Sequence, residues 1–262
     1  MPAPAARVPR LSYFFPAHDE EANLEALVAE ALVALPPLAD EFEIVIVDDG
    51  SRDATPAIAD RLAAAHPEVR AIHTGTNLGY GGAVRTGFLS ARHELIAFTD
   101  GDRQFRVADL GRLLERLAAG DAPDVVVGYR IRRADPPLRL LYARLYKLAN
   151  RVWFGLRTTD VDCACKVFRR DALTGVRVES DGAFFSAELL IKLRARGCRI
   201  VEVGVPHHPR TAGSPTGAKL SVIRRAVRDF WRLRIGLWRD RAATLGRGRP
   251  MVTEAPGSGR GA

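Results

Sequence analysis

Short apolar runs alternate with amphipathic segments along the first half of the chain. The runs LSYFF, FEIVIV, VRAIHT, LIAFT and DVVVG read as strands, and the segments between them read as helices. This alternation is typical of an α/β domain with a single, mostly parallel sheet flanked by helices. Ligands bind outside the carboxyl ends of the strands in such sheets, so we expect the polar clusters that follow the runs to share one rim. These clusters are PAHDEE, DDGS, TNLGYGG, DGDRQ and GYRIRR.

The second half is less regular. A basic, aromatic helix (PLRLLYARLYKLANRVWF), a polar link (TTDVDCACK), a strand (VFRR), a helix (FSAELLIKLRARG) and a strand (RIVEVGV) precede a loop rich in Pro, Gly and Ser. We predict one domain over residues 8–218 and a basic amphipathic helix over residues 219–240. The composition of residues 241–262 predicts a disordered tail.

Composition and charge narrow the class of protein. With 262 residues, 47% of them hydrophobic, the chain can fill a proper core, and its net charge of +8 favours an anionic partner. Nucleic acid, a phosphorylated small molecule and an acidic membrane surface all satisfy that charge. The three cysteines form no CxxC pair, which favours a reducing compartment and argues against zinc. The N-terminus lacks an apolar signal region and no window approaches the ~18 apolar residues of a spanning helix, so we expect a cytoplasmic protein, soluble or peripheral on the inner face of the membrane.

A dinucleotide-binding fold is the first rival, because glycine turns between strands and helices suit NAD. The glycines at 79, 81, 82 and 87 do not form G-x-G-x-x-G, since Val84 stands where the third glycine belongs. They also follow the third strand instead of the first. A P-loop is absent too, so neither hydride transfer nor nucleotide hydrolysis has a local signature.

Two carboxylates, Asp100 and Asp102, follow the fourth apolar run with only Gly101 between them. Gly101 allows a tight bend, and the two carboxylates with the amide oxygen of Gln104 are the hard ligands that Mg²⁺ or Mn²⁺ prefers. A lone DxD pair is a weak motif. Its place at a strand end, level with DDGS and PAHDEE, favours a metal site that phosphates complete.

The DDGS cluster has two interpretations. Asp48 and Asp49 form either an ordinary turn with a helix cap or a carboxylate pair that accepts hydrogen bonds from a nucleoside base or ribose. Glu20 and Glu21 in PAHDEE leave a similar choice, because acids are favoured in the first turn of a helix.

Together these motifs carry a family resemblance. PAHDEE, VDDGS, NLGYGGAVRTG and TDGDRQF, in this order, resemble the nucleotide-diphospho-sugar transferases of family 2, in particular the dolichol-phosphate and polyprenol-phosphate mannose or glucose synthases. The resemblance covers roughly residues 8 to 220. It implies a GT-A fold, an NDP-sugar donor (GDP-mannose or UDP-glucose), a divalent metal, Mg²⁺ or Mn²⁺, and inversion at the anomeric carbon.

The resemblance also implies roles for individual residues. The nucleoside pocket is expected to be lined by Pro16, His18, Glu20 and Asp48, with Asn77 and Gly79 nearby. The metal is expected between Asp100, Asp102 and Gln104. Arg130 and Arg139 fall where the family binds the lipid phosphate, and Arg210 matches the arginine of the loop that closes on the donor diphosphate. A solvated surface is the alternative for any of these arginines in a chain with 39 Lys and Arg residues.

Two segments depart from the family pattern. DVDCACKVF replaces a DPxSGF-like stretch, with Asp162 as a residue that faces the sugar. The loop RTAGSPTGAK separates Lys219 from Arg210 further than the family does, which leaves Lys219 an uncertain phosphate ligand. Glu188 either faces the sugar hydroxyls or lies on a helix surface.

The acceptor is expected to be a polyprenyl phosphate. Many relatives carry transmembrane helices where this chain has residues 219–240, in which apolar and aromatic residues recur at helical spacing among arginines. That pattern suits a helix at an anionic membrane surface, or else one packed on its own domain. A membrane-protein partner is left open, and a nucleic-acid partner is disfavoured because it leaves DGDRQ and DDGS unexplained. A transferase with a soluble acceptor and a non-catalytic nucleotide-sugar binding protein remain the alternative functions.

Overall fold

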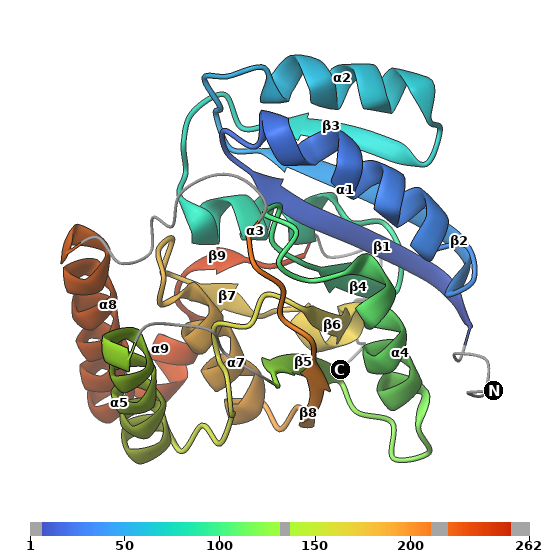
Figure 1. Cartoon of the computed structure of the whole chain (residues 1–262). Coiled ribbons are helices and arrows are strands. Elements are labelled where there is room, and N and C mark those ends of the chain that lie inside the picture. Colours follow the sequence, from blue (N-terminus) through green and yellow to red (C-terminus); the bar gives the residue numbers. More distant parts are fainter. Residues whose placement is uncertain (1–6, 132–136, 211–219, 253–262) are drawn as a thin grey trace, which may run out of the picture.

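The computed structural model describes residues 7–131, 137–210 and 220–252, and for residues 137–141 and 220 it describes the backbone alone. The expected α/β architecture is confirmed: a seven-stranded sheet in the order β3-β2-β1-β4-β6-β5-β8 has helices on both faces (Figure 1). Its pairings are parallel except at β6, which runs antiparallel to both neighbours. The strands are β1 (Val8–Ala17), β2 (Ala39–Asp48), β3 (Val69–His73), β4 (Leu95–Phe98), β5 (Val125–Arg130), β6 (Lys166–Arg169) and β8 (Ile200–Val205).

Helices connect these strands in the order that the sequence pattern predicts. The helices are α1 (Glu21–Ala34), α2 (Thr55–Ala65), α3 (Tyr80–Ser90), the short 3-10 helix η1 (Val107–Asp109), α4 (Leu110–Ala118), α5 (Pro137–Phe154), α6 (Arg170–Leu173) and α7 (Phe185–Ala195). α3 packs on β1 and β2, and α4 packs on β5 and β6.

Aromatic side chains fill the core between α3 and the middle of the sheet. Phe14 of β1 stacks on Phe98 of β4 with ring centroids 5.2 Å apart, and Phe88 of α3 meets both rings edge-on. Phe168 of β6 extends the cluster at 5.1 Å from Phe88. All four are buried, and each contributes roughly 1.5–3 kcal/mol through burial. This cluster fixes how β1, β4 and β6 lie relative to one another, and hence the positions of the residues at their ends.

The C-terminal segment is folded further than the sequence suggests. The predicted helix over residues 219–240 corresponds to α8 (Leu220–Arg239), and it is followed by α9 (Arg241–Gly246) and β9 (Arg249–Pro250). β9 pairs with β7 (Arg177–Val178), and Met251 and Val252 are buried. The predicted disorder is therefore wrong for residues 241–252, because these two apolar side chains anchor the segment; residues 253–262 lie outside the described part.

α8 lies beside α5 (Figure 1). It has two apolar rows of side chains, one buried and one exposed. Phe230 and Leu233 are buried, with the Phe230 ring 4.9 Å from Phe154 of α5 and 5.8 Å from Phe184. A second row at i, i+4 spacing stays exposed, consisting of Ile223, Val227, Trp231 and Ile235, with Trp238 one turn further on. One face of α8 thus packs on its own domain, and contact of the exposed row with a membrane stays a prediction. No helix within the described ranges is long and apolar enough to cross a membrane.

Candidate active site

The sheet topology brings the predicted polar clusters to one rim. Asp48 ends β2, and the Asp49 amide donates to the Ala17 carbonyl at the end of β1 over 2.8 Å. β4 ends two residues before Asp100. Because β6 is antiparallel, its first residue, Lys166, pairs with Phe98, so the segment before it reaches the same rim. DDGS, PAHDEE, DGDRQ and the link TTDVDCACK therefore lie together.

Gly101 allows the DxD loop to lie directly against the end of β1. A Cβ at this position would stand 2.7 Å from the Pro16 carbonyl oxygen, which is closer than real Cβ atoms come to backbone. The DxD loop thus packs directly on the backbone of Pro16. The close packing sets the positions of Asp100 and Asp102 relative to β1.

Asp100 holds a buried oxygen without a partner. Its Oδ1 accepts no hydrogen bond from any described residue, whereas the phenol of Tyr80 hydrogen-bonds to the same carboxyl group. Burial and the charge of Asp102 raise the pKa of Asp100 to about 7, although Lys166 and Tyr80 act in the opposite direction. A buried, unsatisfied carboxylate oxygen costs free energy unless a ligand binds it.

Asp102 is buried and already neutralised by a cation. Its Oδ2 accepts a hydrogen bond from Arg210 Nη2 at 2.6 Å, and its Oδ1 accepts one from the Gln104 amide at 3.1 Å. Gln104 in turn holds the segment that carries Arg210, since its carbonyl accepts from the His208 amide at 2.9 Å and its side-chain Nε2 donates to the His208 carbonyl at 3.3 Å. Three predicted residues, Asp102, Gln104 and Arg210, are thus in one network.

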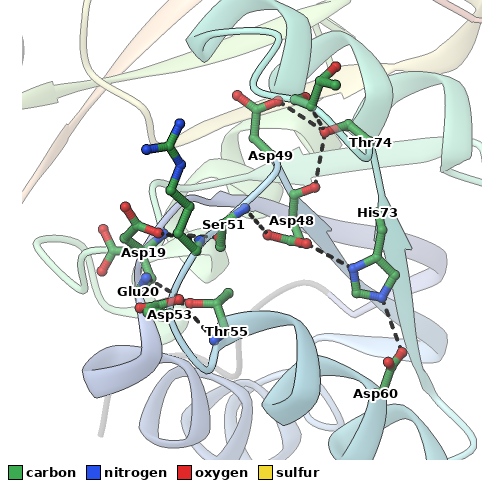
Figure 2. Close-up of polar contacts among 12 residues, drawn as sticks. Asp19, Glu20, Asp48, Asp49, Ser51, Asp53, Thr55, Asp60, His73 and Thr74 are labelled. Atoms are coloured by element: carbon green, nitrogen blue, oxygen red, sulfur yellow. Dashed lines mark hydrogen bonds and ion pairs between the residues drawn. The ribbon is translucent and has the colours of Figure 1, made fainter.

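Asp48 lies in a second network, at the end of β2 (Figure 2). Its Oδ2 is 2.9 Å from His73 Nδ1, and its Oδ1 accepts from the Ser51 amide at 3.0 Å. The other ring nitrogen of His73 lies 3.1 Å from Asp60. Burial alone would raise the pKa of Asp48, but the hydrogen bonds from His73 and Ser51 lower it below its ordinary value. The pKa of His73 is raised, chiefly by its hydrogen bond with Asp48.

Asp49 joins the strand-end turn to the loop before α3, a role that the sequence did not indicate. Its Oδ1 accepts from the Leu78 amide at 2.8 Å and faces Thr74 Oγ1 at 3.3 Å (Figure 2). Asn77 Oδ1 accepts from the Gly79 amide at 2.9 Å, which shapes the same loop. Asn77 is exposed, so it lies at the edge of the rim.

Glu20 lies between the two networks. Its backbone amide donates to Thr55 Oγ1 at 2.9 Å, and its side chain accepts from Asn23 at 2.6 Å. Burial raises its pKa, and the nearby charges of Asp102 and Arg210 act on it in opposite directions. His18 lies at the exposed side of PAHDEE, 3.4 Å from Asp19. The first-turn interpretation describes Glu21, whose side chain accepts from the Ala54 amide at 2.9 Å.

Arg130 is fixed at the end of β5 by a carboxylate that the sequence did not single out. Its Nε and Nη2 donate to the two oxygens of Asp160 at 2.6 and 2.8 Å, and both side chains are less than 10% exposed. The pair is a bidentate contact that orients the guanidinium. Arg139 belongs to the first turn of α5, and its side chain lies outside the described part of the chain, as do Lys219, Arg132 and Arg133.

Lys166 is a buried cation behind the DxD loop. Its Nζ donates to the Cys163 carbonyl and lies 5.4 Å from the centre of the Phe98 ring. Burial lowers its pKa, while Asp162, Asp100 and Asp160 favour its charge. Asp162 is exposed at this edge, which fits a residue near a bound sugar.

Glu188 neither faces the rim nor lies on a helix surface, the two positions that the sequence left open. It is buried in α7, its oxygens accept from the Glu179 and Ser180 amides at 2.8 and 2.9 Å, and it pairs with Lys192 at 2.9 Å. Glu188 therefore stabilises the packing of α7 on the segment at Glu179 and Ser180.

A divalent cation fits the residues that the rim presents. Asp100 offers an unpartnered buried oxygen, and Asp102 offers a carboxylate that already attracts a positive group. No group of three or more His, Cys, Asp and Glu side chains able to hold a metal occurs in the described part of the protein. The site therefore suits Mg²⁺ or Mn²⁺ held by one or two carboxylates, with the oxygens of a phosphate ligand completing its shell.

Comparisons with known proteins agree with this geometry. The model of the family "Glycosyl transferase family 2" matches residues 12–176. Glycosyltransferase AglD of Haloferax volcanii is 34% identical over 76% of this chain, and polyprenol monophosphomannose synthase of Mycolicibacterium smegmatis is 29% identical over 81%. The match covers 33% of the AglD chain and 82% of the synthase chain, so this chain spans a third of the first relative's length.

Solved structures share the fold. Glucosyl-3-phosphoglycerate synthase from Mycobacterium tuberculosis, in complex with phosphoglyceric acid, superimposes with a TM-score of 0.69 at 20% identity, over 87% of this chain and 80% of that one. This likeness supports the GT-A fold expected from the motifs. The family match, the relatives and the arrangement of the rim lead to one conclusion: the chain belongs to glycosyl transferase family 2.

Proposed function

We propose that this chain transfers a hexosyl group from an NDP-sugar to a polyprenyl phosphate, with inversion at the anomeric carbon and with Mg²⁺ or Mn²⁺ bound. The observation that carries the proposal is the Asp100–Asp102 pair at the rim, with an unpartnered carboxylate oxygen on one residue and Arg210 on the other. This arrangement provides for a metal and a diphosphate side by side. Asp48, Asp49 and the loop around Asn77 and Gly79 lie next to it and would receive the nucleoside.

The names of several relatives support the acceptor. The Mycolicibacterium smegmatis relative is a polyprenol monophosphomannose synthase, and one from Micrococcus luteus, 29% identical over 78% of this chain, is an undecaprenyl-phosphate mannosyltransferase. A structural neighbour with a TM-score of 0.67 was solved in complex with Mn²⁺, UDP-glucose and phosphoglyceric acid. That complex supports the metal and the donor class for this fold.

The donor diphosphate would be held by the network around Asp102. Asp100 and Asp102 would hold the cation, which when bound stabilises the charge of the departing diphosphate. Arg210 is already placed beside Asp102, and its guanidinium would donate hydrogen bonds to a phosphate oxygen. Gln104 keeps the Arg210 segment against the DxD loop through its two hydrogen bonds with His208.

The acceptor needs orientation more than it needs a base. A phosphate monoester has its second pKa near ~6, so its oxygen nucleophile is largely ionised at neutral pH. One phosphate oxygen forms the new bond to the anomeric carbon while the bond from that carbon to the diphosphate breaks, and the NDP leaves with the electron pair. Arg130, oriented by Asp160, would hold the acceptor phosphate in line and reduce its repulsion from the donor.

The exposed side of α5 and α8 provides for access to a lipid. Tyr142, Leu145, Leu148, Val152 and Trp153 of α5 are exposed, as is the apolar row of α8, and Trp153 meets Trp231 with ring centroids 5.3 Å apart. We name these exposed apolar side chains of α5 and α8 the two-helix face. Arginines flank it, which suits acyl chains under the aromatic residues and anionic headgroups at the cations. The chain would thus act at the inner face of a membrane as a peripheral protein.

The test is sugar transfer from a panel of radiolabelled NDP-sugars to polyprenyl phosphate in vesicles, with Mn²⁺, Mg²⁺ or EDTA. Wild type is compared with Asp102→Asn and with Glu115→Gln, which alters an exposed carboxylate of α4. We expect metal-dependent label in the lipid fraction for wild type and Glu115→Gln, and its loss in Asp102→Asn. Donor hydrolysis without labelled lipid would overturn the acceptor and favour a soluble one, and donor binding without any turnover would favour a non-catalytic nucleotide-sugar binding protein.

A further inference from the structure

A basic cavity of about 180 Å³ lies at the C-terminal end of α5, behind the turn that leads to Asp160. Its volume is several times the ~30 Å³ that one water occupies in the liquid. Lys147, Arg151, Leu156, Arg157, Thr158 and Thr159 line it. Thr158 and Thr159 begin the link that reaches the rim, but the proposed transfer assigns no role to any of these six side chains, so the cavity needs its own explanation.

The three cations of this cavity, Lys147, Arg151 and Arg157, have no ion-pair partner among the residues that the structure describes. Lys147 and Arg151 lie one turn apart on α5, and Arg151 is in the last turn, where the helix dipole favours positive charge. The dipole does not account for Lys147, or for Arg157, which follows the helix and lines the same cavity. Glu202 contacts the lining residue Thr159, whose amide and hydroxyl donate to its two oxygens at 2.5 and 3.1 Å.

Thr158, which lines the cavity, has an unused hydrogen-bonding group. The residue is 5% exposed, and its Oγ1 is buried without a partner among the described residues. A buried hydroxyl without a partner destabilises the fold, and a bound acceptor group would satisfy it. The hydroxyl and three unpaired cations together suit one chemical class, a phosphate oxygen anion.

The cavity adjoins the two-helix face. Leu148 and Val152 follow Lys147 and Arg151 by one residue each, so the apolar row and the basic row run next to each other along α5. Leu148 and Val152 are exposed. The apolar side chains are thus followed by the cations and then by the polar cavity. This order matches that of acyl chains and phosphate in a lipid layer.

We propose that this cavity binds the phosphate of an anionic phospholipid headgroup and so fixes how the two-helix face lies on the membrane. The choice of a lipid over free phosphate rests on the proposed membrane function, whereas the cavity's affinity for phosphate does not. Thr158 donates to a phosphate oxygen, and Lys147, Arg151 and Arg157 neutralise the phosphate. None of its lining residues is Asp100, Asp102 or Arg130.

Calorimetric titration of the full chain tests this, without NDP-sugar or polyprenyl phosphate, so that the outcome is independent of transfer. The probes are dihexanoyl phosphatidylglycerol below its micelle concentration and inorganic phosphate. Arg151→Gln and Thr158→Val are compared with Arg144→Gln, which removes an exposed arginine of α5 outside the cavity. We expect the short lipid to bind more tightly than phosphate, and the two cavity variants to lose about tenfold in affinity, as one lost charged hydrogen bond predicts.

Thr158→Val makes the test independent of folding. Replacing an unpartnered hydroxyl by a methyl group should leave the melting temperature unchanged or higher, so a loss of binding in this variant comes from the lost donor. Equal weakening by Arg144→Gln would overturn the proposal in favour of diffuse surface charge. Equal affinities for phosphate and lipid would overturn the lipid assignment, and the absence of binding to either probe would overturn the site.

Discussion

Arg210 donates to Asp102 over 2.6 Å, at the carboxylate that the family resemblance assigns to the metal. A guanidinium and a divalent cation compete for the same carboxylate, because two positive groups placed next to each other repel. We therefore expect Arg210 to act as the cation of this site until a diphosphate offers it other oxygens. On this hypothesis, metal binding and donor binding depend on each other.

Replacing Arg210 by Ala should increase Mn²⁺ affinity in the absence of donor. Removal of the competing cation leaves Asp102 without its partner, and we expect several-fold tighter binding in an electron paramagnetic resonance titration. Transfer should fall in the same variant, because the diphosphate loses its arginine. Arg106→Ala is the control, since Arg106 pairs with Glu30 and not with Asp102. Weaker Mn²⁺ binding in Arg210→Ala would show that the arginine supports the metal instead of opposing it.

Asp160→Asn should separate donor binding from transfer. The substitution removes the bidentate carboxylate contact of the buried Arg130, so the guanidinium loses the contact that orients it. We expect NDP-sugar affinity to stay within about twofold and kcat/KM for the lipid acceptor to fall by about 100-fold or more, which corresponds to about 3 kcal/mol of lost positioning. Thermal melting measures the stability cost of the broken pair separately. An equal loss of donor affinity would place Arg130 on the donor side.

Much of this arrangement follows from the sequence, and its gaps have identifiable causes. Asp100, Asp102 and Asp48 stand directly after apolar runs, so strand order alone places them at one rim. Asp160 and Lys166 gave no such signal, because they reach the rim only through the antiparallel strand β6, which periodicity does not distinguish from a parallel one. Glu188 was misjudged because its partners, the amides of Glu179 and Ser180, come from an irregular segment.

The contact between His73 and Asp48 predicts a contribution to stability that depends on pH. The folded-state pKa of His73 lies above its ordinary 6.5, so its stabilisation is fully present below that value and is lost as the pH rises through the folded-state pKa. Urea unfolding should show a larger stability difference between wild type and His73→Gln at about pH 6 than at about pH 8.5. Asp48 stays ionised throughout this range, because its pKa is lowered from 3.8. A pH-independent effect at His73 would refute the bridge to Asp48.

The two-helix face should carry vesicle binding through its exposed tryptophans. Truncation before α8 is an unsuitable test, because it removes Phe230, Leu233 and Met251 from the core. Trp231→Ser with Trp238→Ser should reduce sedimentation with anionic vesicles about tenfold or more, since each side chain loses burial in the lipid. Val33→Ser is the matched control, because Val33 is 78% exposed on α1. Binding by wild type should weaken at high salt. Unchanged binding by the double variant would place the membrane contact elsewhere.

Gly101→Ala tests whether the DxD loop must lie against β1. The added Cβ would stand 2.7 Å from the Pro16 carbonyl oxygen, and neither backbone segment can yield without moving Asp100 or Asp102. We expect a loss of about 1–3 kcal/mol in the free energy of unfolding, as for other overpacked sites, together with weaker Mn²⁺ binding and slower transfer. Gly120→Ala supplies the comparison, because a Cβ there meets nothing within 4 Å, and its effect on stability should stay within about 0.5 kcal/mol. Chemical unfolding measures the first quantity and Mn²⁺ titration the second. If Gly101→Ala bound Mn²⁺ as wild type does, the two carboxylates would not depend on the contact with Pro16, and another feature would have to set their positions.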